Sequence, residues 1–300
     1  MNRQGNGMHD AVAAAPAVAA ATRPLYWSVR RELWEYRSIY LAPLILAGVA
    51  LLGFLIASIG RALTTSDLVQ RRTVLEEPLS FATALILGAA FVVGMIYCME
   101  ALHAERRDRS ILFWKSLPVS DLTVVLSKAS IPFIVLPVVS FAITVATQFI
   151  MLVLGTLVLA GSSMDVSALW AHASLFRESM GLLYHLVTVH ILWYAPIYTW
   201  MLLISAWARR ATFLWVALPP AALCIIERFV FRTHHILALL EYRFSGPKEF
   251  DMSMSGDAAG HMVHSNLVGF LISPGLWIGL LLAVAFLAAA VRLRRCQGPI

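Results

Sequence analysis

Five long stretches of this chain carry no aspartate, glutamate, lysine or arginine, and they constrain its fold more than any other feature. They are Ser38–Gly60, Pro78–Met99, Ala129–Met164, Ser179–Ala208 and Ala258–Val291. A helix needs about 20 apolar residues to cross the hydrocarbon core of a bilayer, and every stretch reaches that length. The sequence therefore predicts a polytopic membrane protein of the all-α class.

A shorter apolar run, Ala211–Ile226, resumes with Phe229-Val230-Phe231 after the charged pair Glu227-Arg228. We interpret it as a sixth span, kinked at Pro219-Pro220 and carrying an ion pair near one end. The predicted spans are 38–60, 78–99, 129–160, 181–207, 211–231 and 266–291. They form a single transmembrane domain, residues 23–300, preceded by a disordered cytoplasmic tail, residues 1–22.

The composition agrees with a membrane protein. Hydrophobic residues make up 60% of the chain and charged residues 13%, whereas a soluble domain has about 45–50% and about 25%. These values exclude an ordinary soluble protein and an intrinsically disordered one. We attribute the net charge of +6 to basic residues that flank spans and contact anionic headgroups, so membrane lipids and no nucleic acid are the expected partners.

The distribution of basic residues predicts the orientation. With six spans and a cytoplasmic N-terminus, arginine and lysine are more numerous in the cytoplasmic segments than in the external ones. The positive-inside rule does not fix the number of spans, because the bias survives if 211–231 fails to cross. Arg292, Arg294 and Arg295 directly follow the last span, which favours six spans with both termini in the cytoplasm.

The segment Pro24–Arg37 has the pattern of a helix lying in the membrane interface. Four apolar positions recur at helical spacing on one face: Tyr26, Val29, Leu33 and Tyr36. The charged positions lie off that face, and Arg31 and Glu35 are spaced for an ion pair. The pattern predicts an amphipathic interfacial helix, with an unstructured linker as the alternative.

The most distinctive stretch lies between the second and third spans. Residues 105–121 are charged at first, then apolar and aromatic, and end in a turn. Ser120 is a predicted helix N-cap, and Asp121 suits the first turn of the helix that follows. On composition alone, Phe113-Trp114 fits either an interface with a partner protein or a segment that dips into the headgroup region.

This stretch, within Ala101–Ser130, resembles the first cytoplasmic loop of ABC-2-type transporter permeases. The likeness consists of an acidic-basic cluster, a Ser-Leu-Pro-Val-Ser turn and a lysine at the start of the third span. The matching residues are Glu105-Arg106-Arg107-Asp108-Arg109-Ser110-Ile111-Leu112, Ser116-Leu117-Pro118-Val119-Ser120 and Ser127-Lys128. Over the rest of the chain the likeness is architectural, and span 211–231, with its proline pair, departs from it.

The resemblance implies a permease subunit of an ATP-driven ABC transporter, an exporter, in the bacterial cytoplasmic (inner) membrane. Its partners would be an ABC ATPase subunit and a second permease half, identical or different. The chain would bind no cofactor, with ATP and Mg on the partner subunit. The residues agree on one point: no lysine follows a glycine, so the Gly-Lys step of a P-loop is missing, and the chain is not expected to be an enzyme.

The resemblance also assigns a role to the loop, which would seat on the ATPase and couple its closure to the spans. The charged collar of this coupling loop would be Glu105, Arg106, Arg107, Asp108 and Arg109. Its apolar plug would be Phe113, Trp114, Leu117 and Pro118.

Polar residues inside the spans have two interpretations each. His185 and His190 in the fourth span either line a substrate path or form helix–helix hydrogen bonds. Glu227-Arg228 is either a gate or a snorkelling pair at the end of the fifth span. Gly275 and Gly279 form a GxxxG motif, which permits close packing within the chain or between chains.

The sequence gives little support for a metal site, a disulfide bond or a catalytic site. The external histidines have no acidic residue or cysteine that completes a ligand set, and the three cysteines are far apart, so no metal site and no disulfide are expected. No catalytic nucleophile–base pair is visible.

Two alternatives to a permease remain open. One is a multi-pass membrane scaffold or sensor that recruits a soluble partner, and the other is an ion-coupled secondary transporter. The second usually shows an internal repeat or charges within the spans. The nearly charge-free spans suit an apolar or amphipathic cargo.

Overall fold

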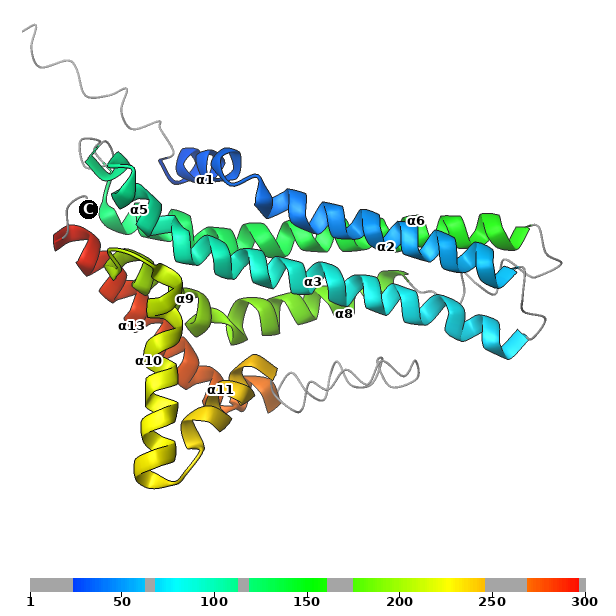
Figure 1. Cartoon of the computed structure of the whole chain (residues 1–300). Coiled ribbons are helices and arrows are strands. Elements are labelled where there is room, and N and C mark those ends of the chain that lie inside the picture. The colour runs from blue at the N-terminus through cyan, green and yellow to red at the C-terminus, as the bar shows by residue number, and fades with distance from the viewer. Residues whose placement is uncertain (1–23, 63–67, 113–118, 161–174, 246–268, 297–300) are drawn as a thin grey trace, which may run out of the picture.

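The computed structural model describes residues 24–62, 68–112, 119–160, 175–245 and 269–296 (Figure 1). Every regular element in these ranges is a helix, which confirms the all-α class. The predicted tail, residues 1–22, lies outside the described residues.

The main helices of the described residues follow one another in this order along the chain. They are α1 (Pro24–Glu35), α2 (Ser38–Ala62), α3 (Leu68–Arg107), α5 (Asp121–Ser130), the π-helix η2 (Ile131–Val135), α6 (Leu136–Ala160), α8 (Leu175–His185), the π-helix η3 (Leu186–Trp193), α9 (Ala195–Trp207), α10 (Thr212–Ile226), the π-helix η4 (Glu227–Phe231), α11 (His235–Ser245) and α13 (Pro274–Cys296).

Five helical stretches are long and apolar enough to cross a membrane: Ser38–Ser58, Pro78–Arg107, Asp121–Leu157, Thr212–Phe231 and Pro274–Cys296. A sixth is formed if Leu175–Trp193 and Ala195–Trp207, which meet at a bend of 45°, make one broken span. The bend has a local cause, because Pro196 has no N–H to donate and disfavours a helical residue before it. The described residues thus hold five or six candidate membrane-spanning helices, which fits a multi-pass membrane protein.

Several span boundaries differ from the prediction, most clearly in the third and the last span. The third stretch begins at Asp121 rather than at residue 129, because Ser120 caps it as predicted: its Oγ accepts a hydrogen bond from the Thr123 N–H at 3.1 Å. The last helix begins at Pro274, where the missing N–H costs no helical hydrogen bond. It continues past residue 291 through its arginines, whose charges favour a helix C-terminus.

The central element is α3, which packs against α2, α6 and α9, while α9 packs against α13 (Figure 1). The side chains at its centre are buried completely, among them Cys98, Ala101, Tyr198 and Leu202. Small side chains let the helices approach closely. A Cβ atom on Gly94 would lie only 3.0 Å from the Tyr198 ring of α9 and 3.3 Å from Leu136 of α6.

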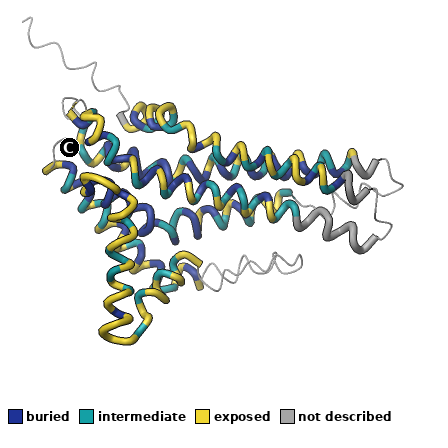
Figure 2. Tube along the Cα trace, viewed as in Figure 1, coloured by how far each residue is buried: buried dark blue, intermediate teal, exposed yellow. Residues whose placement is uncertain are grey.

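Helix α10 leaves this bundle and runs across it, and α11 folds back beside it (Figure 1). Only 6% of its apolar window is buried, against 22% to 39% for the other four long stretches, and Figure 2 shows its surface almost wholly exposed. The chain reverses at Arg232, which adopts a left-handed conformation with φ 53°. Helix α11 therefore forms a hairpin with α10.

Helix α1 forms where the periodicity predicts it, and Arg31 pairs with Glu35 at 3.6 Å. Three of the four residues of its predicted apolar face, Val29, Leu33 and Tyr36, pack against the core of the bundle. The fourth, Tyr26, is exposed, so most of this face contacts protein.

We predict that Gly94→Ala lowers the free energy of unfolding by about 1 kcal/mol relative to Gly88→Ala, because only the first added methyl meets neighbouring side chains. Gly88 lies on the same helix and has open space around its added Cβ. Thermal unfolding of both variants in detergent measures the difference. Equal stabilities would contradict the close packing at Gly94.

Candidate functional site

Five charged side chains meet at the end of the bundle where α1, α3, α5 and α13 converge. This charge cluster consists of Glu32, Glu105, Asp121, Lys128 and Arg294. Four of the five are buried, with at most 7% of the residue exposed, and Asp121 lies at the edge. The cluster thus places two carboxylates and two cations out of contact with bulk water, and Asp121 stays partly exposed.

The ion pairs form a continuous chain. Lys128 Nζ lies 2.7 Å from Glu32 Oε1 and 3.2 Å from Glu105 Oε1. The other oxygen of Glu105 binds the Arg294 guanidinium, whose Nε lies 3.1 Å from Asp121 Oδ1. Because each cation has two carboxylates, the desolvation cost of each cation is offset by two partners.

Two tyrosines close the cluster on the side of α1. The Tyr97 hydroxyl donates a hydrogen bond of 2.8 Å to the second oxygen of Glu32, and the ring of Tyr36 packs edge-on against Tyr97 with centroids 5.1 Å apart. Burial raises the pKa of Tyr36, and the nearby carboxylates of Glu32 and Glu35 raise it further. Tyr36 therefore stays neutral beside the acidic side of the cluster.

The residue after Glu105 connects the same end of α3 to α9. The Arg106 guanidinium donates to the carbonyl oxygens of Ala206 at 2.6 Å and Ala208 at 3.3 Å. These carbonyls lie at the C-terminus of α9, where a cation both completes their hydrogen bonding and favours the helix dipole. The Ser205 hydroxyl in turn accepts the backbone N–H groups of Leu102 and His103 at 3.0 and 2.9 Å.

The residues of the predicted coupling loop are therefore divided between two environments. Glu105 and Arg106 point into the bundle and are buried, while Arg107 and Asp108 form an exposed pair at 3.2 Å. Arg109 ends the helical run with a left-handed backbone, φ 57°. The predicted apolar plug, Phe113, Trp114, Leu117 and Pro118, lies outside the described residues.

The sequence interpretation missed the cluster as a unit. Glu32 and Arg294 were not singled out as site residues, and their partners lie 96 and 189 residues away. One signal was present: Lys128 stands alone at the entrance to a long charge-free stretch. A charge at that depth requires a partner, although its identity cannot be deduced from the local sequence.

The two histidines of the broken span are placed differently. His190 is buried, and its Nε2 lies 3.1 Å from the Tyr198 hydroxyl, which ties η3 to α9. The buried Nδ1 of His185 has no hydrogen-bond partner in the described structure. Two oxygens of α6, Thr144 Oγ1 and Gln148 Oε1, share that property, and Gln148 Nε2 donates to Thr83 of α3 at 3.1 Å.

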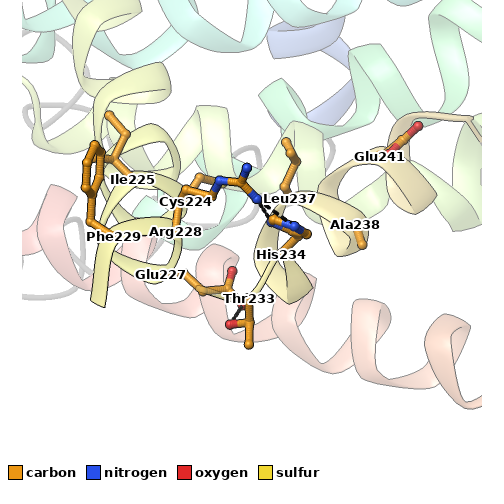
Figure 3. A pocket seen from close by; sticks show the side chains of 10 residues that line it. All are labelled: Cys224, Ile225, Glu227, Arg228, Phe229, Thr233, His234, Leu237, Ala238 and Glu241. Carbon is orange, nitrogen blue, oxygen red and sulfur yellow. Dashed lines mark hydrogen bonds between the residues drawn. The ribbon is translucent and has the colours of Figure 1, made fainter. Parts of the chain in front are cut away.

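Glu227 and Arg228 do not pair with each other in the described structure. The carboxylate of Glu227 accepts the backbone N–H groups of His235 and Ile236, both at 2.7 Å, and the Thr233 hydroxyl at 2.8 Å. It thereby caps the N-terminus of α11, where a negative charge is favourable. Arg228 turns instead toward the ring of His234, as Figure 3 shows.

The hairpin of α10, η4 and α11 encloses a hollow of about 600 Å³ (Figure 3). Its walls mix apolar side chains, among them Ile225 and Leu237, with the charged groups of Arg228 and Glu241. Because Glu227 caps α11, hydrogen bonds join the two halves of the hairpin.

The GxxxG motif serves contacts within the chain. A Cβ atom on Gly275 would lie 3.4 Å from the Tyr242 ring, and one on Gly279 would overlap the Arg243 guanidinium. Arg243 also donates to the Gly275 carbonyl at 3.0 Å and lies over the Trp193 ring, 4.4 Å from its centroid. The two glycines therefore make room for α11 against α13.

Among the described residues, no group of three or more histidines, cysteines, aspartates or glutamates is arranged to hold a metal ion. No protein-family model, curated protein or solved structure matches the chain.

We predict that Glu32→Gln lowers the free energy of unfolding by about 3 kcal/mol, because it breaks a buried ion pair and leaves Lys128 only partly compensated. The matched control is Glu35→Gln, one turn later on the same helix, whose pair with Arg31 is exposed. That change should cost less than about 1 kcal/mol. Denaturant unfolding in detergent measures both, and similar losses would argue against the cluster.

Glu227→Gln is expected to loosen the hairpin while leaving the bundle intact, because the neutral amide is a weaker acceptor for the first N–H groups of α11. Hydrogen exchange of the α11 amides should accelerate severalfold. Glu241→Gln, on the exposed surface of the same helix, is the control. Unchanged exchange in Glu227→Gln would show that the cap is dispensable.

Proposed function

We propose that this chain is the permease subunit of an ATP-driven ABC transporter, working with a separate ATPase subunit and a second permease half. The proposal rests on the resemblance of residues 101–130 to the coupling loop of ABC-2-type permeases and on the multi-pass helical architecture. We further propose that the protein lies in the cytoplasmic membrane of a bacterium and that both of its termini are in the cytoplasm. In support, α1, the end of α13 and both flanks of the loop lie at one end of the bundle (Figure 1).

One observation carries the proposal: the charge cluster joins both flanks of the loop to the rest of the bundle. Glu105 precedes the loop, Asp121 follows it, and both bind Arg294 of α13. Lys128, about two turns after Asp121 on the same helix α5, adds Glu32 of α1. A displacement applied at the loop would therefore move α1, α3, α5 and α13 together rather than bend the loop alone.

The mechanism that follows is a rigid-body one. ATP binding on the partner would close its subunits, and the exposed part of the loop, including Arg107 and Asp108, would follow that motion. Arg106 would carry the displacement to the end of α9, through its hydrogen bonds to Ala206 and Ala208. The bend before Pro196 is then a suitable hinge, since the two halves of the broken span already meet there at 45°.

The polar groups at membrane depth are candidates for the cargo path. Thr144, Gln148 and His185 each carry a buried polar atom without a hydrogen-bond partner in the described structure. Burying such an atom between apolar side chains without a hydrogen bond costs free energy. The atom gains a hydrogen-bond partner when water or a polar cargo group enters the space beside it. His190 is already bonded to Tyr198, so we assign it to packing rather than to the path.

The test is capture of the ATPase. Tagged full-length chain is purified from its native membrane in mild detergent, and co-purifying proteins are identified by mass spectrometry. We expect a P-loop ATPase in near-equal amount. Arg107→Glu should reduce its recovery roughly tenfold, because reversing an exposed charge opposes a complementary surface.

The matched control is Arg177→Glu, an exposed arginine on α8 at the other end of the bundle, which should leave recovery unchanged. Both variants should insert normally, since neither side chain is buried. Absence of any nucleotide-binding subunit, under conditions that preserve other membrane complexes, would favour a scaffold or a secondary transporter. An equal loss of ATPase recovery in both variants would mean that the ATPase does not bind specifically at Arg107.

A further inference from the structure

Helix α1 carries an exposed stripe that neither the bundle nor the proposed transport function uses. This α1 stripe consists of Trp27, Arg30 and Trp34, whose spacing puts them on one helical face. Trp27 is 55% exposed and Trp34 is 72% exposed. The guanidinium carbon of Arg30 lies between them, 5.4 Å from the centroid of the Trp27 ring and 5.8 Å from that of Trp34.

The opposite face of α1 is fixed to the bundle, so the helix cannot roll to bury the stripe. Glu32 is held by Lys128 and by Tyr97, and Ser28 is buried beside it along the helix. Val29 and Leu33 pack against the core. The tryptophans therefore face outward because the buried charge cluster sets the rotation of the helix.

The chemistry of the stripe fits the boundary between lipid headgroups and acyl chains. Tryptophan prefers this region, where its ring is in an apolar environment and its N–H stays hydrated. A guanidinium binds phosphate through several donors and stacks on aromatic faces at the same time. Arg30 forms no ion pair with any described residue, so its charge is available to an external anion.

The position of the stripe agrees with this environment. α1 lies at the end of the bundle where the exposed arginines of the α9–α10 connection and of the α13 C-terminus also lie (Figure 1). Arg31 and Arg37 add positive charge at the same level. Clusters of basic residues at the level of a membrane surface select anionic lipids.

We propose that the α1 stripe binds the headgroups of anionic phospholipids, with Arg30 at the phosphodiester and the two tryptophans on either side at the headgroup boundary. This assigns lipid contact to the face of α1 opposite the buried residues Ser28 and Glu32. The binding does not depend on transport, so it stands or falls separately from the permease function.

The experiment places the full-length protein in lipid nanodiscs and measures quenching of tryptophan emission. The quencher is phosphatidylglycerol or phosphatidylcholine brominated on the part of the acyl chain nearest the headgroup. The difference between wild type and the variant W27F/W34F isolates emission from the two stripe tryptophans. We expect brominated phosphatidylglycerol to quench this difference signal at a lower lipid fraction than brominated phosphatidylcholine does.

Arg30→Gln should reduce that preference roughly fivefold, because one basic residue near an anionic surface is lost. Trp277→Phe is the matched control. Trp277 is 57% exposed, at the start of α13, and no arginine lies over its ring within the described part of the chain. Its emission should be quenched equally by the two lipids.

Three outcomes would overturn the proposal. Absence of quenching of the stripe by either lipid would mean that it faces water or protein. Equal quenching by both lipids, unchanged in Arg30→Gln, would remove the anionic selectivity. Loss of ATPase capture in W27F/W34F with lipid quenching unaltered by Arg30→Gln would assign the surface to a protein partner.

Discussion

The buried ion pairs of Lys128 and Arg294 with three carboxylates are the interaction on which the arrangement of this end of the molecule depends. They join four helices that are distant in sequence, and Arg106 adds the end of α9 through its carbonyls. Replacing such a cluster with apolar residues can be neutral, but removing one member leaves a charge without a partner at large cost. The cluster therefore fixes a particular geometry more than it adds stability.

That geometry has consequences on both sides of the cluster. On one side it sets the rotation of α1 and so exposes the tryptophans and Arg30. On the other it connects Glu105 and Asp121, which flank the loop, to Arg294 of α13. The lipid contact and the coupling role are separate proposals that depend on the same set of ion pairs.

The hairpin of α10 and α11 shows how the outer part of the fold is held without a large core. Helix α10 buries little of its own surface, and the hairpin is organised instead by Glu227 at the N-terminus of α11 and by Arg243 at its other end. Arg243 lies in the space left by Gly275 and Gly279. Polar contacts can hold this unit because an apolar exterior gains nothing from leaving lipid for protein.

The sequence by itself determined the class of protein, most helices and several helix ends, because these depend on local properties. Charge-free length predicts spanning helices, periodicity predicts α1, and the Ser120 cap needs only its own next turn. What only the tertiary structure decided is which charges meet and which face of a helix is covered. Glu32 and Lys128 lie 96 residues apart, and no local pattern distinguishes a glutamate that is buried with a lysine from Glu35, which stays exposed one turn later. Pairing across the bundle depends on how the helices pack, and helix packing is a property of the whole chain.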